Sequence, residues 1–536
     1  MKRLLATVAF GAMLMAGTAS FTSAALAETP KDQLIVAFNM NNVLTMDPAA
    51  ITGGEAVQIL NNVYDSLAQL DPETRALEPR LAESWDIAPD NMSVTFHLRA
   101  DAKFASGNPV TADDVAYSFK RLLTLNLAQA SYLKSRGFKS EEVDKYFVAK
   151  DAHTFVLTLP QADDPKLIIM VLTQAGPGSI LDSKLVMSNE KDGDMGKDWL
   201  TNNSAGSGAF SLTKWRANEY VILTRNDNFW GGAPAMKRVL MRHLPESQTQ
   251  RLGLEQGDLD IGFSLAAADL KALKEKSDLT ITSVPSAGFY YLAVSMKDER
   301  FANPKVREAL RYLIDYKGIN ETIMPFFGVE RQRPINSGAF SAMADPGYTF
   351  DVAKAKALLA EAGYPDGFNT TLRAISTQEF LDSATAIQST LAQAGIKAEI
   401  ITGGGSQIYG AMRNREFELI VGRGGGGQFP HPDSNLRAMV YNPNNADEAK
   451  LTNYQGWRTS FFNEELNSII EKALVEPDQA KQTELYKDIQ VKMDKDIIPS
   501  ILPFSERVVT AAYQANVKHV IIDPWVCRFE AVSKSE

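Results

Sequence analysis

The stretch Lys103-Phe-Ala-Ser-Gly-Asn-Pro-Val-Thr-Ala-Asp-Asp-Val-Ala-Tyr-Ser-Phe119 and the segments around it decide the fold class. Thr111 and Asp114 have the spacing of a capping box, which predicts that a helix begins there. Residues 93–98 and 151–159 alternate apolar and polar side chains, as half-buried strands do. Residues 34–38 form a short apolar run with β-branched side chains, typical of a strand. The first part of the chain is therefore predicted to mix strands and helices.

Beyond about residue 300 the pattern becomes an alternation of helices and strands. Asn303 and Pro304 suit the N-cap and first helical positions, and apolar residues then recur on one face as far as Gly318. Asp351 is predicted to begin a second helix that stops at Gly363. Further helices are expected over residues 381–394, 463–474 and 479–494, and strands over residues 397–401 and 418–421. This part is predicted to be an α/β unit.

The N-terminus has the pattern of a secretory signal peptide. Lys2 and Arg3 precede an apolar run over residues 4–16, and Ala25-Leu26-Ala27 supplies small residues at a cleavage site. Cleavage is expected to leave Glu28 as the new N-terminus. The run is shorter than the roughly 20 residues that span a bilayer. Because no cysteine follows it, a lipid anchor is not expected, and the mature protein is predicted to be free in a periplasm.

Length and charge narrow the class further. The mature chain of about 509 residues exceeds the size at which one core keeps growing, so two or more lobes are expected. Removing residues 1–27 takes the formal charge from −10 to −12, which disfavours nucleic acid and anionic lipid as partners. The single cysteine, Cys527, leaves no internal disulfide to form. It is interpreted as a buried small apolar residue.

Several motifs, taken in order, resemble the extracellular solute-binding protein family that includes the dipeptide- and oligopeptide-binding proteins of ABC importers. Besides the opening stretch they are Leu44-Thr-Met-Asp-Pro48, Asn62-Val-Tyr-Asp-Ser-Leu67, Leu81-Ala-Glu-Ser-Trp85, Gly206-Ser-Gly-Ala-Phe210, Gln256-Gly-Asp-Leu-Asp260, Val306-Arg-Glu-Ala-Leu310 and Ala360-Glu-Ala-Gly-Tyr364. Each motif is weak alone, but the collinear set covers essentially the whole mature chain.

The resemblance implies a two-lobed α/β periplasmic binding protein fold in which the chain crosses twice between the lobes. Lobe 1 is expected over residues 28–288 and 504–536, with an extra subdomain at 62–205, and lobe 2 over residues 289–503. It further implies that a small-molecule or peptide-like ligand closes the lobes by a hinge motion. An inner-membrane ABC permease then recognises the closed form. The protein is expected to be a monomer that needs no cofactor or metal.

The candidate ligand site centres on Arg423-Gly-Gly-Gly-Gly-Gln-Phe-Pro-His-Pro-Asp433. In the peptide-binding relatives a corresponding loop carries an aspartate that pairs with the ligand's ammonium group, and Gln428 stands at that position. Because Gln428 cannot neutralise an ammonium group, ordinary di- and oligopeptides are disfavoured as ligands. Arg423 suits a carboxylate or phosphate, or else forms a structural salt bridge. Gly425 and Gly426 let backbone amides approach a ligand, or simply form a turn.

Other cleft candidates carry alternatives of their own. Trp457 is positioned to stack on a ligand, or packs in a core. His431 fits a metal-chelate ligand, or is a tucked histidine. Tyr290 near the first crossover suits ligand contact or hinge packing. The remaining candidates are Phe429 in the glycine-rich loop, Thr45, Met46, Thr52 and Gly53 after the first strand, and Arg331 and Arg333 as further cations.

No enzyme is predicted. The sequence has no His-Glu-x-x-His motif, no Gly-x-Ser-x-Gly elbow, no Cys-His set and no phosphate-binding P-loop. Besides import, two functions stay open: a receptor that presents its ligand to a sensor protein, and a chaperone-like holder of unfolded peptide. A missing permease gene favours the receptor, and a wide apolar cleft favours the chaperone.

Overall fold

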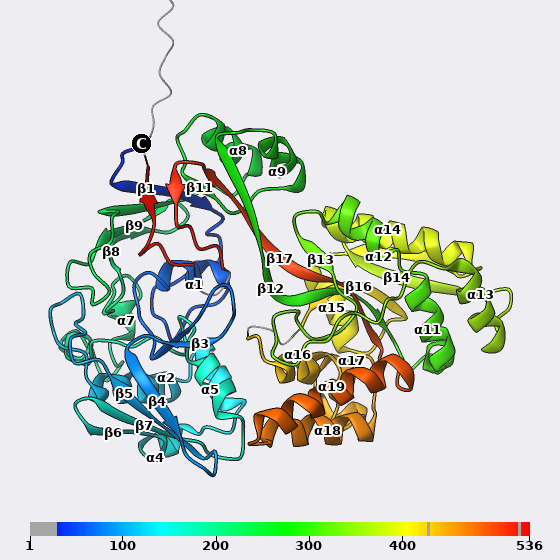
Figure 1. The fold of residues 1–536 in the computed structure, drawn as a ribbon, viewed down its shortest axis with the longest axis horizontal. Coiled ribbons are helices and arrows are strands. Elements are labelled where there is room, and N and C mark those ends of the chain that lie inside the picture. The colour runs from blue at the N-terminus through cyan, green and yellow to red at the C-terminus, as the bar shows by residue number, and fades with distance from the viewer. Residues whose placement is uncertain (1–28, 426–428, 524–526, 536) are drawn as a thin grey trace, which may run out of the picture.

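The structure is a computed structural model that describes residues 29–425, 429–523 and 527–535. Two α/β lobes lie side by side and are joined by two long strands, β12 (Leu279–Val294) and β17 (Ile501–Gln514) (Figure 1). The signal peptide predicted over residues 1–27 lies outside the described residues. No described helix has the length and hydrophobicity that a membrane crossing requires.

The first lobe contains the elements before β12. Its strands are β1 (Gln33–Phe38), β2 (Ala68–Leu70), β3 (Leu77–Pro79), β4 (Ala82–Ile87), β5 (Ser93–Leu98), β6 (Phe147–Asp151), β7 (Thr154–Thr158), β8 (Phe210–Arg216), β9 (Tyr220–Arg225), β10 (Arg238–His243) and β11 (Ile261–Gly262). Its helices are α1 (Gly54–Leu60), α2 (Ala112–Leu125), α3 (Ser131–Lys134), α4 (Val143–Tyr146), α5 (Pro165–Val171), α6 (Ser183–Ser188), α7 (Lys197–Leu200), α8 (Ser247–Glu255) and α9 (Ala267–Lys274).

The second lobe contains the elements between β12 and β17. Its strands are β13 (Gly328–Glu330), β14 (Asn369–Ile375), β15 (Lys397–Gly403) and β16 (Leu419–Gly424). Its helices are α10 (Glu299–Ala302), α11 (Pro304–Tyr312), α12 (Tyr316–Gly318), α13 (Val352–Glu361), α14 (Gln378–Gln393), α15 (Gly405–Arg413), α16 (Pro432–Met439), α17 (Gln455–Arg458), α18 (Glu464–Val475) and α19 (Gln479–Lys495). After β17 the chain returns to the first lobe, where β18 (Val517–Lys518) pairs with β19 (Ser533–Lys534).

Local capping chemistry explains why several of these helices begin where the sequence predicts. Thr111 and Asp114 form the predicted capping box at the start of α2. The side chains of Asn303 and Asp351 accept hydrogen bonds from the first turns of α11 and α13. The helix predicted as far as Gly318 is shorter, because α11 ends at Tyr312 and a separate turn, α12, follows it.

One sheet passes through both lobes in the strand order β15-β14-β16-β12-β17-β11-β1-β10-β9-β8. β12 pairs with β16 of the second lobe through residues 289–294, and β17 pairs with β11 of the first lobe. The register of the β12–β17 ladder shifts between Pro285 and Phe289. Such an irregularity bends a strand. We propose that the lobes divide at residues 288–289 and 503–504, as predicted, since both points lie in these paired strands.

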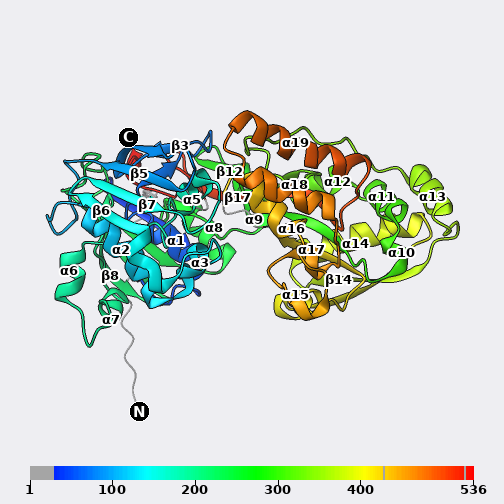
Figure 2. The same ribbon diagram turned by 90° about the horizontal axis from the view of Figure 1, so that it is seen from below.

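The second lobe is built around the two faces of its sheet. The run of β12 from Phe289 to Val294 is apolar at every position, which suits a strand covered on both sides. Tyr290 and Leu292 face the core under α11, α13 and α14, while Phe289 and Tyr291 face the core under α15, α16, α18 and α19. These helices cover the sheet on both faces (Figure 2).

A separate sheet, β4-β5-β7-β6, lies in the first lobe away from the long strands. Phe96, Phe119 and Phe155 pack between this sheet and α2. The main sheet of the first lobe packs instead on a second core that includes Val36, Val239 and Cys527. The extra subdomain predicted over residues 62–205 stays a proposal, which the separate core under β4–β7 supports.

Candidate functional site

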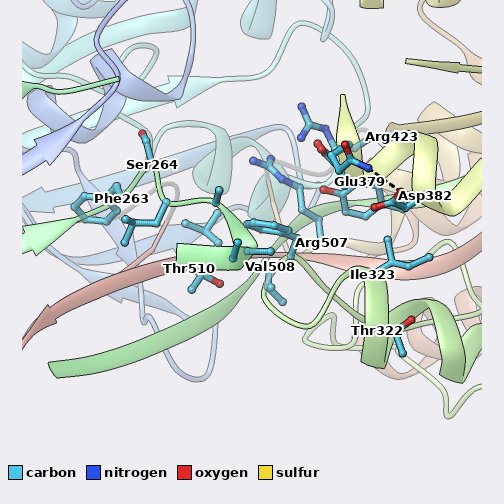
Figure 3. A pocket seen from close by; sticks show the side chains of 18 residues that line it. Phe263, Ser264, Thr322, Ile323, Glu379, Asp382, Arg423, Arg507, Val508 and Thr510 are labelled. Carbon is cyan, nitrogen blue, oxygen red and sulfur yellow. Dashed lines mark hydrogen bonds between the residues drawn. The ribbon is translucent and has the colours of Figure 1, made fainter. Parts of the chain in front are cut away.

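A cavity of about 620 Å³ lies beside the long strands and is lined from both lobes. The first lobe contributes residues 263–268, and β17 contributes residues 507–510. The second lobe contributes Arg423, the start of α14, and Thr322, Ile323 and Phe327 after α12. Figure 3 shows Phe263 and Ser264 at one end, Arg423, Glu379 and Asp382 at the other, and Arg507 and Val508 between them.

A second cavity of about 310 Å³ adjoins the first. Phe263, Ser264, Arg507 and Val509 line both, so the two cavities form one continuous cleft. The wall that belongs only to the second cavity comes from Phe38 and Asn39 at the end of β1 and from Gly54, Glu55 and Gln58 of α1. The cleft therefore reaches from the second lobe to the loop that joins β1 to α1.

Two cations and three acidic side chains, Glu55, Glu379 and Asp382, line the cleft. Arg507 lies on β17 and Arg423 lies near the end of β16. Burial lowers the pKa of Arg507 and the charge of Arg423 lowers it further, with Tyr290 acting in the opposite direction. The acidic side chains of Glu379 and Asp382 line the same cavity. Asp382 Oδ1 accepts a hydrogen bond from Gln378 Nε2 at 2.8 Å.

The glycine-rich loop begins at this cleft. Arg423 and Tyr290, both predicted to contact a ligand, line the cavity. Their contact with a ligand stays a prediction. Gly425 has a φ of 145°, and a Cβ there would lie 2.5 Å from Asn435 Oδ1. The chain therefore needs glycine at this position. Two further predicted residues, Gly426 and Gln428, lie outside the described residues.

Phe429 and His431 contact the first lobe instead of the cavity. Phe429 packs in the core of β4–β7 and meets the ring of Tyr132 edge-on, with ring centroids 6.5 Å apart. His431 is buried; its Nδ1 accepts from the backbone of Asp433, and its Nε2 lies 3.1 Å from Asp164 Oδ2. These contacts tie the end of the glycine-rich loop to α5 on the opposite lobe (Figure 1).

Asp164 is the polar centre of that interlobe contact. Gln482 Nε2 of α19 also donates to Asp164 Oδ2, at 2.8 Å. Burial acts to raise the pKa of Asp164, but its hydrogen bond with His431 and the charge of His431 outweigh burial, and the pKa is lowered. Nearby, Arg136 of the first lobe lies 3.8 Å from Asp433 of the second.

Trp457 lies inside the second lobe and does not line the cleft. Its side chain is 3% exposed inside the second lobe, and its Nε1 donates to the carbonyl of Ala446 at 3.0 Å. The guanidinium of Arg415 lies over the ring, 4.7 Å from the centroid. The alternative of core packing therefore describes Trp457 in this structure.

Arg331 and Arg333 are not exposed cations, because both are buried and paired. Arg331 Nη1 lies 3.0 Å from Asp345 Oδ1, and Arg333 Nη2 lies 2.7 Å from Asp494 Oδ2. These pairs give both arginines a structural role, and a contribution to an anion site stays an untested prediction. Their charges are neutralised inside the second lobe.

The loop after β1 reaches only the edge of the cleft. Thr52 and Gly53 are exposed and directly precede Gly54, which lines the second cavity. Thr45 is half-buried, and Met46 is fully buried in the core of the first lobe, so packing explains Met46 in this structure. Contact of Thr45, Thr52 or Gly53 with a ligand stays a prediction.

The remaining residues with reactive or metal-binding side chains are the possible metal ligands and the single cysteine, Cys527. Among the described residues, no group of three or more His, Cys, Asp or Glu side chains is placed to hold a metal ion. Cys527 is fully buried, and burial raises the pKa of its thiol. It packs in the core of the first lobe, in agreement with its interpretation as a small apolar residue.

Sequence reasoning missed Arg507 and the segment 263–268. The signal for Arg507 is one cation in a strand-like run, after Ile501-Leu-Pro-Phe-Ser-Glu506 and before Val508-Val509. Nothing in that run shows which face of the strand meets a cavity. Residues 263–268 match no motif, and only the docking of β11 beside β17 brings them to the cleft.

Two lobes, two crossing strands and a cleft lined from both sides define a binding protein of the periplasmic type. The chain belongs to the bacterial extracellular solute-binding proteins, family 5, whose model it matches over residues 76–447. Members of this family are solute-binding proteins, and their extracytoplasmic location agrees with the predicted export of this chain.

Named relatives match over most of the chain. The probable D,D-dipeptide-binding periplasmic protein DdpA of Escherichia coli (strain K12) is 29% identical over 479 residues, which are 87% of each chain. Heme-binding protein A of Haemophilus influenzae is 27% identical over 504 residues, covering 90% of this chain and 88% of the relative. The periplasmic binding protein DppA of Helicobacter pylori, solved with the peptide STSA, has a TM-score of 0.71 at 26% identity, covering 94% of this chain and 98% of that one.

Proposed function

We propose that this protein is the periplasmic substrate-binding component of an ABC importer. It captures a peptide-like or other amphipathic small solute in the interlobe cleft and delivers it to an inner-membrane permease. The observation that carries the proposal is a cleft lined by the first lobe, the second lobe and the strand β17 that joins them. A solute there gains its full set of contacts only when the lobes close on it, and that difference in affinity drives closure.

The lining suits an amphipathic solute. Phe263, Tyr290 and Val509 supply apolar surface, and the charged side chains are Arg423, Arg507, Glu379 and Asp382. The proposed function requires no bond to be made or broken, so we propose that the protein is not an enzyme. Relatives named for a D,D-dipeptide and for heme share this family, so family membership does not fix the solute.

Thermal-shift screening of the chain from residue 28 tests the proposal. The panel contains peptides, opines and glycosyl phosphates. A solute that binds only the folded protein at 100 times its Kd stabilises it by about 2.7 kcal/mol and raises its melting midpoint. Small-angle scattering with that solute is expected to show a smaller radius of gyration. A protein that no member of the panel stabilises would contradict the proposal.

Gln428 gives a specific expectation for dipeptides in this screen. Ordinary dipeptides are expected to give no shift, because Gln428, unlike an aspartate at its position, cannot neutralise the ligand's ammonium group. A clear dipeptide shift would overturn that argument but would support capture of a solute.

A further inference from the structure

Arg507 occupies the point where the two cavities of the cleft meet, since it lines both. It lies on β17, the strand that runs from one lobe to the other. Its position differs from that of a surface arginine, because the residue is only partly exposed and lines both cavities. Any solute that fills both cavities passes this guanidinium group.

The charge of Arg507 is not compensated by contact. Within residues 29–425, 429–523 and 527–535, the side chains of Arg507 and Arg423 make no hydrogen bond or ion pair. The guanidinium of Arg423 lies over the ring of Phe380, 6.0 Å from its centroid. Glu379 and Asp382 line the same cavity and Glu55 lines the adjoining one, and none of them forms an ion pair with either arginine within the described residues. The two arginines therefore face the same cleft as three acidic side chains, but neither has an ion-pair partner among the described residues.

The buried arginines elsewhere in the first lobe show the contrast. Arg121 donates two hydrogen bonds to Asp47, and Arg80 forms ion pairs with Asp65 and Glu530. Burying a cation without a partner is costly, so a fold normally supplies the counter-ion. Arg507 has no such partner among the described residues, and desolvation together with the charge of Arg423 lowers its pKa.

We propose that Arg507 and Arg423 together bind an anionic group of the captured solute, so that this protein imports an acidic compound. The inference rests on the proposed function and names its substrate class: an amphipathic carboxylate or phosphate ester. Guanidinium groups match the planar oxygen pairs of both groups with two parallel hydrogen bonds. The anion also removes the repulsion between the two arginines, and Phe263 and Val509 cover the apolar part of the solute.

Calorimetry and thermal shift with matched solute pairs test the inference at constant ionic strength. The pairs are peptides and their C-terminal amides, aromatic carboxylic acids and their amides, and sugar phosphates and their parent sugars. The proteins are wild type, R507Q, R423Q and the control R413Q, whose arginine is exposed at the end of α15 and does not line the cleft. The peptide and organic-acid pairs test for a carboxylate ligand, and the sugar pairs test for a phosphate ligand.

The expected result is that the acidic member of at least one pair raises the melting midpoint and its neutral partner does not. R507Q and R423Q are each expected to weaken that binding about 10- to 100-fold, as loss of a charged hydrogen bond does, while R413Q leaves it unchanged. The midpoint of unliganded R507Q is expected to equal or exceed that of wild type, because the removed guanidinium has no partner. A purely structural arginine would instead lower it.

Two other results overturn the inference in distinguishable ways. Equal binding of acidic and neutral members, or binding that R507Q and R423Q leave intact, refutes the anion site but leaves solute capture in place. Failure of every member of the panel to bind any of the four proteins refutes the anion site and the proposed function together.

Discussion

Replacing Arg121 by methionine tests how the loop between β1 and α1 is held at the cleft. Arg121 Nη1 and Nη2 donate to Asp47 Oδ1 and Oδ2 at 2.9 and 2.7 Å, and Arg121 Nε donates to the carbonyl of Met195 at 2.8 Å. Both side chains of the pair are 1% exposed. Burial acts to lower the pKa of Arg121, but the hydrogen bonds and charge of Asp47 outweigh it and raise the pKa.

R121M leaves the carboxylate of Asp47 buried with one remaining hydrogen bond, from the backbone of Ala49 at 3.0 Å. Breaking a buried ion pair by removing one partner costs about 3–5 kcal/mol of the free energy of unfolding. D47N alone is expected to cost a similar amount, because it leaves the arginine charge uncompensated. The double variant R121M/D47N is expected to cost less than the two single variants together, by at least about 2 kcal/mol.

Urea unfolding followed by tryptophan fluorescence measures these differences. The matched control is K237M, which breaks the exposed pair of Lys237 and Asp32, whose side chains are 65% and 53% exposed. Exposed pairs are worth about 0–1 kcal/mol, so K237M is expected to have little effect. A cost below about 1 kcal/mol for R121M, or strictly additive single changes, would refute the idea that this pair holds the loop.

Further predictions concern acid stability and the interlobe contact. Burial acts to raise the pKa of Glu530, but the charge of Arg80 and its hydrogen bonds outweigh it and hold the pKa at about 2, against a usual 4.5. A carboxyl group with a depressed pKa stabilises the fold fully above pH 4.5 and loses that effect as the pH falls towards 2. In urea unfolding at a series of pH values, wild type is therefore expected to lose up to about 3 kcal/mol of its free energy of unfolding over this range. E530Q is expected not to show this loss. F429A empties part of the core under β4–β7 and is expected to cost about 3 kcal/mol in the same assay, whereas F462A, at a side chain 48% exposed, is expected to change stability by less than about 0.5 kcal/mol. An E530Q profile parallel to wild type, or equal costs for the two phenylalanine variants, would contradict these assignments.

The sequence predicts those parts of the fold that depend on local chemistry. Thr111 with Asp114, Asn303 with Pro304, and Asp351 each supply the hydrogen-bond acceptor or fixed backbone angle that begins a helix, and the structure has helices at all three. The two lobes and the two crossings between them are predicted only from the order of the family motifs. Local chemistry cannot predict them, because the pairing between β12 and β17 joins residues more than 200 positions apart.

The site is less predictable because its charges depend on distant partners. The sequence does not show that Arg333 meets Asp494, or that Arg507 meets no acid among the described residues. Trp457 is a comparable case, since its burial follows from how α17 packs in the second lobe and not from its neighbours in sequence. Arg423 could be placed at the cleft because it begins the glycine-rich loop, and Tyr290 because it lies near the expected first crossover, and both line the cavity.

The distance between the lobes, measured with and without a stabilising solute, tests the central claim most directly. Cysteines replacing Lys271 on α9 and Lys317 on α12 are exposed and lie on opposite lobes, while Cys527 is fully buried and is expected to stay unlabelled. Spin labels at these positions are expected to report one shorter distance at saturating solute. An unchanged distance distribution, with the solute shown to be bound by calorimetry, would contradict capture by closure of the two lobes.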